Sequence, residues 1–207
     1  MYANDNESKL VQNLPATNTL TPLSNTFPPT TNMWSLGSMK SSLQATDPQL
    51  LRYGLLYPYT SQTALYHCPA DLSQINGLPR VRSYSMNGWI GSSYMNSRPG
   101  EAAYQTFVKE SGMAGKGTSQ LWVFMDEHEA SIDDSWFEVT MNDSAPFASF
   151  PATRHGRGYN LNFADGHVEH YKLQDPNSQF PPAQGTMSPM NGDWVRLKLV
   201  TTVPWGQ

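Results

Sequence analysis

Acidic residues gather at one place in the chain, directly after the short apolar run of residues 121–125. Carboxylates clustered at the end of a strand suit a hard cation such as Ca²⁺, which prefers oxygen ligands. The spacing matches no EF-hand loop, because the central glycine and the glutamate at position twelve are lacking. A solvated acidic turn is the simpler interpretation of the same cluster. Its members are Asp126, Glu127, His128, Glu129, Asp133 and Asp134.

Three histidines and one cysteine are the other residues that could do chemistry. His167 and His170 are separated by an odd number of positions, so on a strand they lie on opposite faces and do not easily share an ion. Cys68 follows His67, which is one way to activate a thiolate. Neighbouring side chains in an extended chain point apart, however, and a small buried hydrophobic residue is the favoured interpretation of Cys68. His155 remains a candidate metal ligand or general base.

Motifs of hydrolytic enzymes do not occur. The chain contains neither a His-Glu-x-x-His zinc motif nor a Gly-x-Ser-x-Gly nucleophile elbow. We therefore predict that the protein is not an enzyme. A metal-dependent hydrolase that uses Asp126, Glu127 and His155 is a distant alternative.

Six tryptophans allow a different kind of site. Exposed indole rings can form a platform for carbohydrate, although tryptophans more often fill the core of a thin sheet. The candidates for such a platform are Trp34, Trp89, Trp136 and Trp205.

The composition narrows the class of protein. The 207 residues include 13 Lys+Arg and 17 Asp+Glu, and the charged fraction is only 14%. Ser, Thr, Asn and Gln replace the charged residues, as is typical of exported proteins rich in β-structure. The near-neutral chain has no basic region for nucleic acid, and one cysteine cannot close an internal disulfide. No run of 18 apolar residues and no basic-then-apolar leader occurs in the sequence as given.

The expected elements are helical toward the N-terminus and extended toward the C-terminus. Residues 1–33 are predicted to be the end of a helix followed by a polar, proline-rich arm, and residues 34–207 a globular domain. An amphipathic helix is expected over residues 47–59, and a helical turn or two within residues 101–110. Strands are expected over residues 121–125, 136–141, 158–164, 167–172 and 194–200, with a turn or short strand over residues 82–90.

The strongest local signal is a hairpin. Residues 158–164 alternate strictly, with Tyr159, Leu161 and Phe163 on one face, and Asp165-Gly166 follows at once. A two-residue Asp-Gly loop is typical of tight hairpins. In that register Phe163 faces Val168. The elements together predict an α+β fold with helical segments packed on a mostly antiparallel sheet.

Several segments resemble one bacterial family. Nine residues separate His155 from Asp165-Gly166, as in the H-x9-D-G motif of prepilin-type proteins, which include type II secretion pseudopilins. Four further segments resemble, in order, the end of that family's N-terminal helix, its Cys-Pro-x-Asp segment, its Ser-Tyr-x-x-Asn stretch and its strand ending in Asp-Glu. They are residues 1–6, 66–71, 82–87 and 123–127.

The resemblance implies a pilin-like fold and a structural role. Such proteins carry an N-terminal apolar helix that prepilin peptidase processes, that anchors the subunit in the inner membrane and that later packs in a filament. We expect this chain to be the soluble head of such a subunit, periplasmic or extracellular, with other pseudopilins or copies of itself as partners. Related subunits bind calcium, which makes Asp126, Glu127 and Asp165 the candidate ligands. Alternatively, His155 and Asp165 hydrogen-bond each other across the hairpin base.

Two hypotheses on function therefore stand side by side. The first is a filament or secretion-apparatus subunit without catalysis. The second is an exported carbohydrate-binding module that uses the four tryptophans named above.

Overall fold

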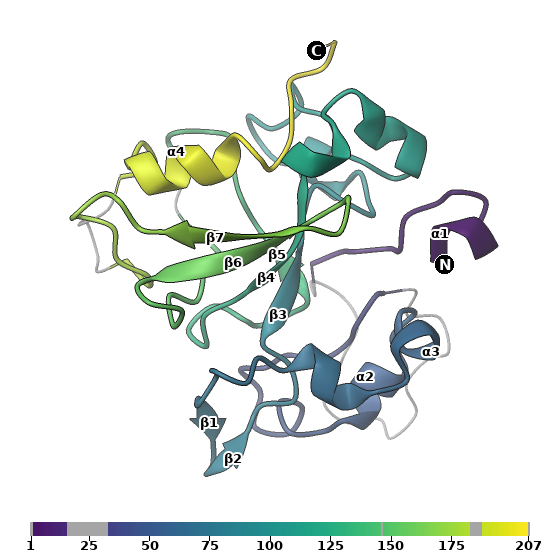
Figure 1. Cartoon of the computed structure of the whole chain (residues 1–207), viewed down its shortest axis with the longest axis vertical. Coiled ribbons are helices and arrows are strands. Elements are labelled where there is room, and N and C mark those ends of the chain that lie inside the picture. Colours follow the sequence, from purple (N-terminus) through teal and green to yellow (C-terminus); the bar gives the residue numbers. More distant parts are fainter. Residues whose placement is uncertain (1, 16–32, 146, 183–187, 207) are drawn as a thin grey trace.

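The computed structural model describes residues 2–15, 33–145, 147–182 and 188–206. Much of the predicted polar arm, residues 16–32, lies outside these ranges. The fold is mixed α+β, with one larger sheet and a few short helices (Figure 1). Within the described ranges, no helix has the length and apolar character needed to cross a bilayer.

The larger sheet has five strands in the order β5-β3-β4-β6-β7, and every neighbouring pair is antiparallel except β3 with β5. The mostly antiparallel sheet expected from the sequence is therefore confirmed. A separate two-stranded ribbon joins β1 to β2. The strands are β1 (Gln74–Ile75), β2 (Leu78–Pro79), β3 (Tyr84–Asn87), β4 (Trp122–Asp126), β5 (Trp136–Phe137), β6 (Gly158–Phe163) and β7 (Val168–Lys172).

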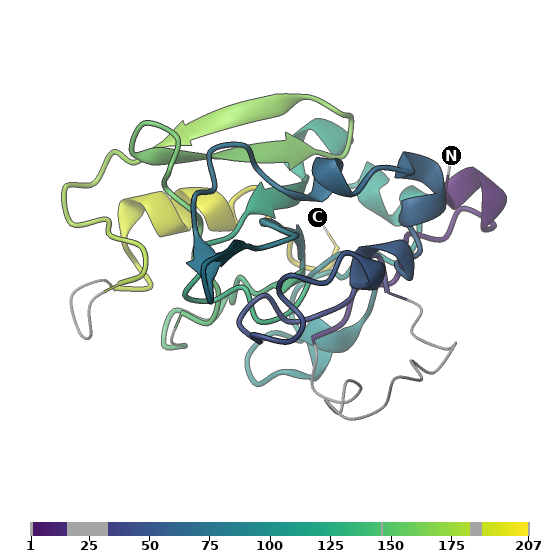
Figure 2. The same cartoon turned by 90° about the horizontal axis from the view of Figure 1, so that it is seen from below.

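The helices are short and lie mainly around the sheet. The α-helices are α1 (Tyr2–Asp5), α2 (Gln49–Arg52), α3 (Tyr57–Thr60) and α4 (Gly192–Lys198). The 3-10 turns are η1 (Thr63–Tyr66), η2 (Tyr94–Ser97), η3 (Glu110–Ala114) and η4 (Thr118–Gln120). In both views α4 runs beside the β6–β7 hairpin, whereas α2 and α3 belong to the N-terminal part of the chain (Figures 1 and 2).

The two faces of the sheet have different partners. Tyr159, Leu161 and Phe163 share one face of β6, as their alternation predicted, and pack in a core with Trp194 and Leu197 of α4. Asn160 and Asn162 point to the opposite face, which meets the N-terminal part of the chain. The alternation of β6 thus separates a closed apolar core from a face that carries polar groups.

The helix predicted over residues 47–59 is interrupted. Asp47 accepts a hydrogen bond from the backbone N–H of Gln49, so the predicted start is present, and Leu50 and Leu51 are buried. At Gly54 the backbone passes so close to Trp34 that a Cβ atom would lie 2.4 Å from its carbonyl oxygen. The N–H of Leu55 then bonds to Met33 instead of continuing a helix, because tertiary pairing replaces the local hydrogen bonds.

Two further predictions in the middle of the chain are wrong in extent. Residues 101–110 form no helix before η3; Glu101 instead accepts hydrogen bonds from the backbone N–H groups of Met141 and Asn142. The strand predicted over residues 136–141 pairs only as β5, because the following N–H groups bond to side chains rather than to another strand.

The hairpin is confirmed, but its loop is longer than predicted. Asn162, not Phe163, is paired with Val168, and the N–H of Phe163 bonds to the carbonyl of His167. The loop therefore has three residues, with Gly166 at a φ of 94°. A three-residue loop that ends in a left-handed glycine is the next commonest hairpin after the two-residue type.

The strand predicted over residues 194–200 is wrong, because that segment forms α4. The Asn191 side chain accepts hydrogen bonds from the N–H groups of Asp193 and Trp194, which caps the helix start. Trp194 and Leu197, three residues apart, point together into the core. The spacing of these two residues fits a helix, and the asparagine cap favours it over the strand.

A matched pair of leucines tests this assignment. Leu197 is fully buried and Leu199 is 67% exposed, whereas in a strand the two would share a face. We expect Leu197→Ala to lower the free energy of unfolding by about 2–5 kcal/mol. Leu199→Ala is expected to change it by about 0.5 kcal/mol or less. Chemical denaturation of both variants is the measurement, and equal losses would contradict the helix.

Asp193 gives α4 a dependence on pH. Burial by itself raises the pKa of this carboxyl, but hydrogen bonds from Ser178 and from the N–H groups of Gln174 and Asp175 hold the pKa below its usual value. A depressed folded-state pKa stabilises the fold above the unfolded pKa of about 3.9, and this contribution is lost as pH falls through the folded value. We expect the stability difference between wild type and Asp193→Asn to be large at pH 7 and to shrink at pH 3. A difference that is constant with pH would show that the charge is irrelevant.

Candidate functional site

A partly buried arginine pairs with three carboxylates at the end of β4. Arg154 lies in the turn before β6, and its Nη1 is 2.8 Å from Oδ1 of Asp126 and 3.2 Å from Oδ2 of Asp71. Its Nη2 is 3.0 Å from Oε2 of Glu129. The side chains of Asp71 and Asp126 are almost fully buried, at 3% and 1% exposed. Two buried carboxylates are thus neutralised largely by one guanidinium.

Asp71 is fixed by further hydrogen bonds. The Ser83 hydroxyl donates to its Oδ2 at 2.6 Å, and the N–H of Ser73 donates to its Oδ1 at 2.9 Å. Burial alone raises the pKa of this carboxyl, but these hydrogen bonds and the charge of Arg154 outweigh burial and lower it. Asp71 therefore stays ionised at neutral pH.

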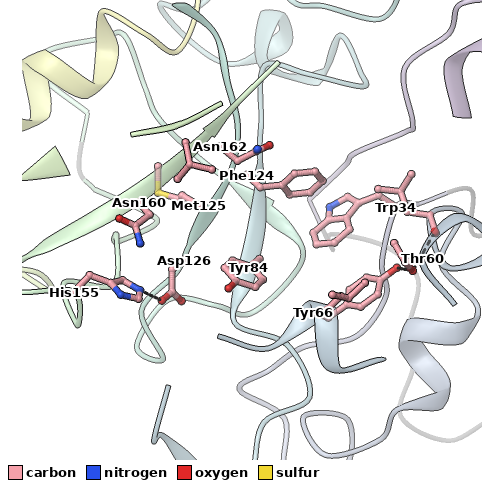
Figure 3. Close-up of a pocket in the computed structure, with 13 residues that line it drawn as sticks. Trp34, Thr60, Tyr66, Tyr84, Phe124, Met125, Asp126, His155, Asn160 and Asn162 are labelled. Atoms are coloured by element: carbon pink, nitrogen blue, oxygen red, sulfur yellow. Dashed lines mark hydrogen bonds and ion pairs between the residues drawn. The ribbon is translucent and has the colours of Figure 1, made fainter. Parts of the chain in front are cut away.

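Cys68 and His155 meet Asp126 on its other side. Nε2 of His155 is 3.5 Å from Sγ of Cys68 and 3.2 Å from Oδ2 of Asp126. These ligand atoms all lie within 4.8 Å of one another, which makes them the one set of three candidate metal ligands within the described ranges. Figure 3 shows His155 and Asp126 side by side at one end of a pocket.

This arrangement does not activate the thiol. In a cysteine–histidine–carboxylate relay, the carboxylate binds one ring nitrogen and the thiol the other. Here both partners face Nε2. Burial, and then the negative charge of Asp126, raise the pKa of the Cys68 thiol, so it remains protonated at neutral pH. Burial also raises the pKa of Asp126 to about 6, against the lowering effect of Arg154.

A cavity of about 410 Å³ opens beside these groups and is named here the Trp34 pocket. Asp126, His155 and Asn160 form its polar end, and aromatic rings form most of the opposite wall (Figure 3). Trp34 packs edge to face on Phe124 and stacks on Tyr66. A largely apolar cavity with a few polar groups is the usual form of a small-ligand site. Its lining comprises Trp34, Leu56, Thr60, Leu65, Tyr66, Tyr84, Phe124, Met125, Asp126, His155, Asn160, Asn162 and Val168.

Glu127 lies apart from this site although it follows Asp126 in the chain. It accepts a hydrogen bond from the Ser131 hydroxyl at 2.7 Å and is fully buried. Burial raises its pKa to about 8, and hydrogen bonds from Ser85 and Ser131, with the nearby charge of Arg82, only partly oppose this. Burial likewise lowers the pKa of Arg82, to about 10. Glu127 is therefore a protonated, structural carboxyl at neutral pH.

The predicted calcium ligands Asp126, Glu127 and Asp165 do not come together. Asp165 lies in the β6–β7 loop, where it binds His167, and the adjacent N–H of Ala164 bonds to Leu121 just before β4. Asp126 is at the other end of β4, five residues further, or roughly 16 Å at the rise of a strand. The residues do not fit a shared calcium ion.

The predicted hydrogen bond between His155 and Asp165 is wrong for a related reason. The two residues flank opposite ends of β6, and each has its own partner, Asp126 for His155 and His167 for Asp165. Gly166 follows as the left-handed residue of the loop. The nine-residue spacing of the motif is thus the length of one strand and its flanking turns.

The tryptophan platform is also contradicted. Trp34, Trp89 and Trp136 are at most 5% exposed, and only Trp205 of the four is exposed, at 56%. The indole N–H groups of the three buried rings donate to backbone carbonyls of Ser135, Val139 and Gly88. These rings are buried with their one polar group satisfied, so they form no exposed platform for sugar. Trp34 contributes only to the lining of the Trp34 pocket.

Sequence reasoning missed the central residue of the site. Arg154 directly precedes His155, and nothing in the sequence pattern shows that it pairs with Asp71 and Asp126. Asp71 and Ser83 each stood in a segment that resembles the prepilin-type family. The residue pattern of these segments does not show which of their polar side chains pair in the fold.

Comparison with known proteins found no relative of this chain. A scan against family models, a search of curated proteins and a search of solved structures each found no match. The resemblance to prepilin-type proteins therefore stays a prediction that rests on the residues themselves.

Removing the arginine tests its role as the central counter-charge. Arg154→Ala leaves Asp71 and Asp126 buried without their cation, and breaking a buried pair costs about 3–5 kcal/mol. We expect a loss of this size in the free energy of unfolding, measured by denaturant titration. Arg52→Ala, at an exposed position of α2, is the control and is expected to change stability by about 0.5 kcal/mol or less. Similar losses of stability in the two variants would contradict the role of Arg154 as the main counter-charge of Asp71 and Asp126.

Proposed function

We propose that this protein is a structural subunit of a type II secretion pseudopilus or a type IV pilus-like filament, without catalysis. The main support is that the segments resembling the prepilin-type family come together in one network of hydrogen bonds and ion pairs. The Cys-Pro-x-Asp segment supplies Asp71, the Ser-Tyr-x-x-Asn segment supplies Ser83, and the strand ending in Asp-Glu supplies Asp126. Arg154, next to the motif histidine, binds both carboxylates.

The remaining motif residues also have structural contacts. Asn87 of the Ser-Tyr-x-x-Asn segment donates from its amide to the backbone carbonyls of Trp122 and Thr201. Asp165 accepts a hydrogen bond from the N–H of His167, and Gly166 takes the left-handed conformation of the hairpin loop. Residues that hold loops and strands in register are what a domain selected for its shape, rather than for turnover, requires.

The proposal extends to fold family, partners and location. The pilin-like fold is part of it, with copies of the chain or other pseudopilins as filament partners. Prepilin peptidase and the inner-membrane assembly machinery would act on a form that carries the apolar helix, and the described domain would lie in the periplasm or outside the cell. The N-terminal helix α1 lies at the periphery of the molecule, where a preceding helix would not cross the core (Figures 1 and 2).

The carbohydrate-binding alternative now depends on Trp205 alone. Its indole ring is 56% exposed, and its N–H donates to the carbonyl of Ala102. Saturable quenching of tryptophan fluorescence by a panel of glycans, abolished in Trp205→Ala, would favour this alternative.

The coding DNA upstream of Met1 provides the test of the filament role. We expect an in-frame segment that encodes a short basic leader, a Gly-Phe-Thr-Leu-x-Glu-type site and about 20 apolar residues. Co-expression of that longer form with a prepilin peptidase should then shorten it by the length of the leader, as measured by mass spectrometry. An upstream region without such a segment, or a longer form that the peptidase leaves intact, would contradict the filament role.

A further inference from the structure

We propose that Cys68, Asp126 and His155 bind a zinc ion whose fourth coordination position faces the Trp34 pocket. The site goes beyond the filament role, because it rests on the geometry of three side chains and on no property of an assembly. The three residues come from separate parts of the chain: Cys68 follows η1, Asp126 ends β4, and His155 precedes β6.

The distances among the three ligand atoms fit tetrahedral zinc. With Zn–S of about 2.3 Å and Zn–N and Zn–O of about 2.0–2.1 Å, a tetrahedron separates sulfur from nitrogen by about 3.5 Å and nitrogen from oxygen by about 3.3 Å. The structure has 3.5 Å from Sγ of Cys68 to Nε2 of His155 and 3.2 Å from that nitrogen to Oδ2 of Asp126. The third edge lies within the 4.8 Å that encloses the set.

Nε2 of His155 faces both Cys68 and Asp126, and the Cys68 thiol also interacts with the Asp126 carboxylate, so the three groups converge on one point. Nε2 of a neutral imidazole offers either one proton or one lone pair. It therefore makes a full hydrogen bond to Cys68 or to Asp126 but not to both. An ion between the three atoms binds the lone pair of His155, the thiolate of Cys68 and Oδ2 of Asp126 at the same time. Sulfur and imidazole ligands favour zinc over calcium, which prefers oxygen alone.

The surroundings prepare the ligands. Arg154 binds Oδ1 of Asp126, which leaves Oδ2 for the ion and fixes the carboxylate plane. The N–H of Cys68 donates to the Ser83 hydroxyl, so the backbone beside the thiol is also held. The charges nearly balance: the thiolate, Asp126, Asp71 and the partly exposed Glu129 carry four negative charges, and Zn²⁺ with Arg154 carries three positive ones. When the ion binds, the thiol proton leaves to solvent.

The Trp34 pocket gives the ion its access and its fourth ligand. Asp126 and His155 line the pocket together with Tyr84 and Asn160 (Figure 3). Cys68 is not part of the lining and is 2% exposed. Three protein ligands with one open position are the arrangement in which zinc keeps a water or an exogenous ligand. The chemical class of the resident ion is thus a borderline-soft divalent cation with water toward the cavity.

Cobalt is the probe that reads the site directly. The chelator-treated protein is titrated with Co²⁺ and followed by absorption spectroscopy. We expect one equivalent to produce a thiolate-to-cobalt charge-transfer band and the visible bands of tetrahedral Co²⁺. Because the chain has one cysteine, that band reports Cys68 and no other residue. One equivalent of Zn²⁺ is expected to abolish the spectrum, and Ca²⁺ to leave it unchanged. Absence of the charge-transfer band would overturn the site.

Variants assign the other two ligands. Cys68→Ser should abolish the charge-transfer band, and Asp126→Asn and His155→Gln should each weaken Zn²⁺ binding at least about tenfold in calorimetric titration. His167→Gln is the control, since this histidine is on the hairpin and away from the set. Equal weakening by His167→Gln, or unchanged binding by Cys68→Ser, would overturn the assignment. If a variant fails to fold, the spectrum of the wild type decides alone, and neither result depends on the upstream DNA that tests the filament role.

Discussion

The pairing of the partly buried Arg154 guanidinium with two buried carboxylates is the interaction on which the arrangement of the chain's central segments depends. It lies between two carboxylates that come from parts of the sequence 55 positions apart, Asp71 and Asp126. Each carboxylate is costly to bury alone, and neither segment could approach the other without a cation between them. The Arg154 side chain is 15% exposed, so solvent screens the charges only in part. The turn before β6, the end of β4 and the segment after η1 are therefore held as one unit.

The two faces of the sheet have different surroundings. On one face α4 closes an apolar core around Trp194 and Leu197. On the other, Asn160 and Asn162 meet aromatic side chains of the N-terminal segment across the Trp34 pocket. Strict alternation along β6 makes both possible, since each residue faces one side only. The same strand thus places apolar side chains in the core on one face and polar side chains in the pocket on the other.

The sequence predicted β4, β6, β7 and the hairpin well, and tertiary contacts poorly. Period-two alternation showed which face of β6 is buried, because that signal is local and strong. It did not fix the loop length, since both two- and three-residue loops use Asp and Gly, and the register differs by one position. Residues 194–200 carried signals for both states, and the asparagine cap that selects the helix stood three positions earlier.

The sequence pattern did not predict contacts between residues that lie far apart in the chain. The helix at residues 47–59 breaks because Gly54 packs against the backbone of Trp34, a contact across 20 positions. The candidate site was not predicted for the same reason. The sequence indicates that Cys68 is a small buried residue, and only the fold brings it to His155, 87 positions away. Acidic neighbours such as Asp126 and Glu127 looked like one site, yet they enter different environments.

The outer edge of the sheet is poorly suited to pairing with a further strand. β7 is the last strand in the order and presents one side without a strand neighbour among the described residues. It carries Glu169, His170 and Lys172, all exposed, and Arg196 donates to the carbonyl of Lys172. Charged side chains on an edge discourage the addition of another strand, because their solvation would be lost. A neighbouring molecule would therefore contact this side of the domain through side chains and would not extend the sheet.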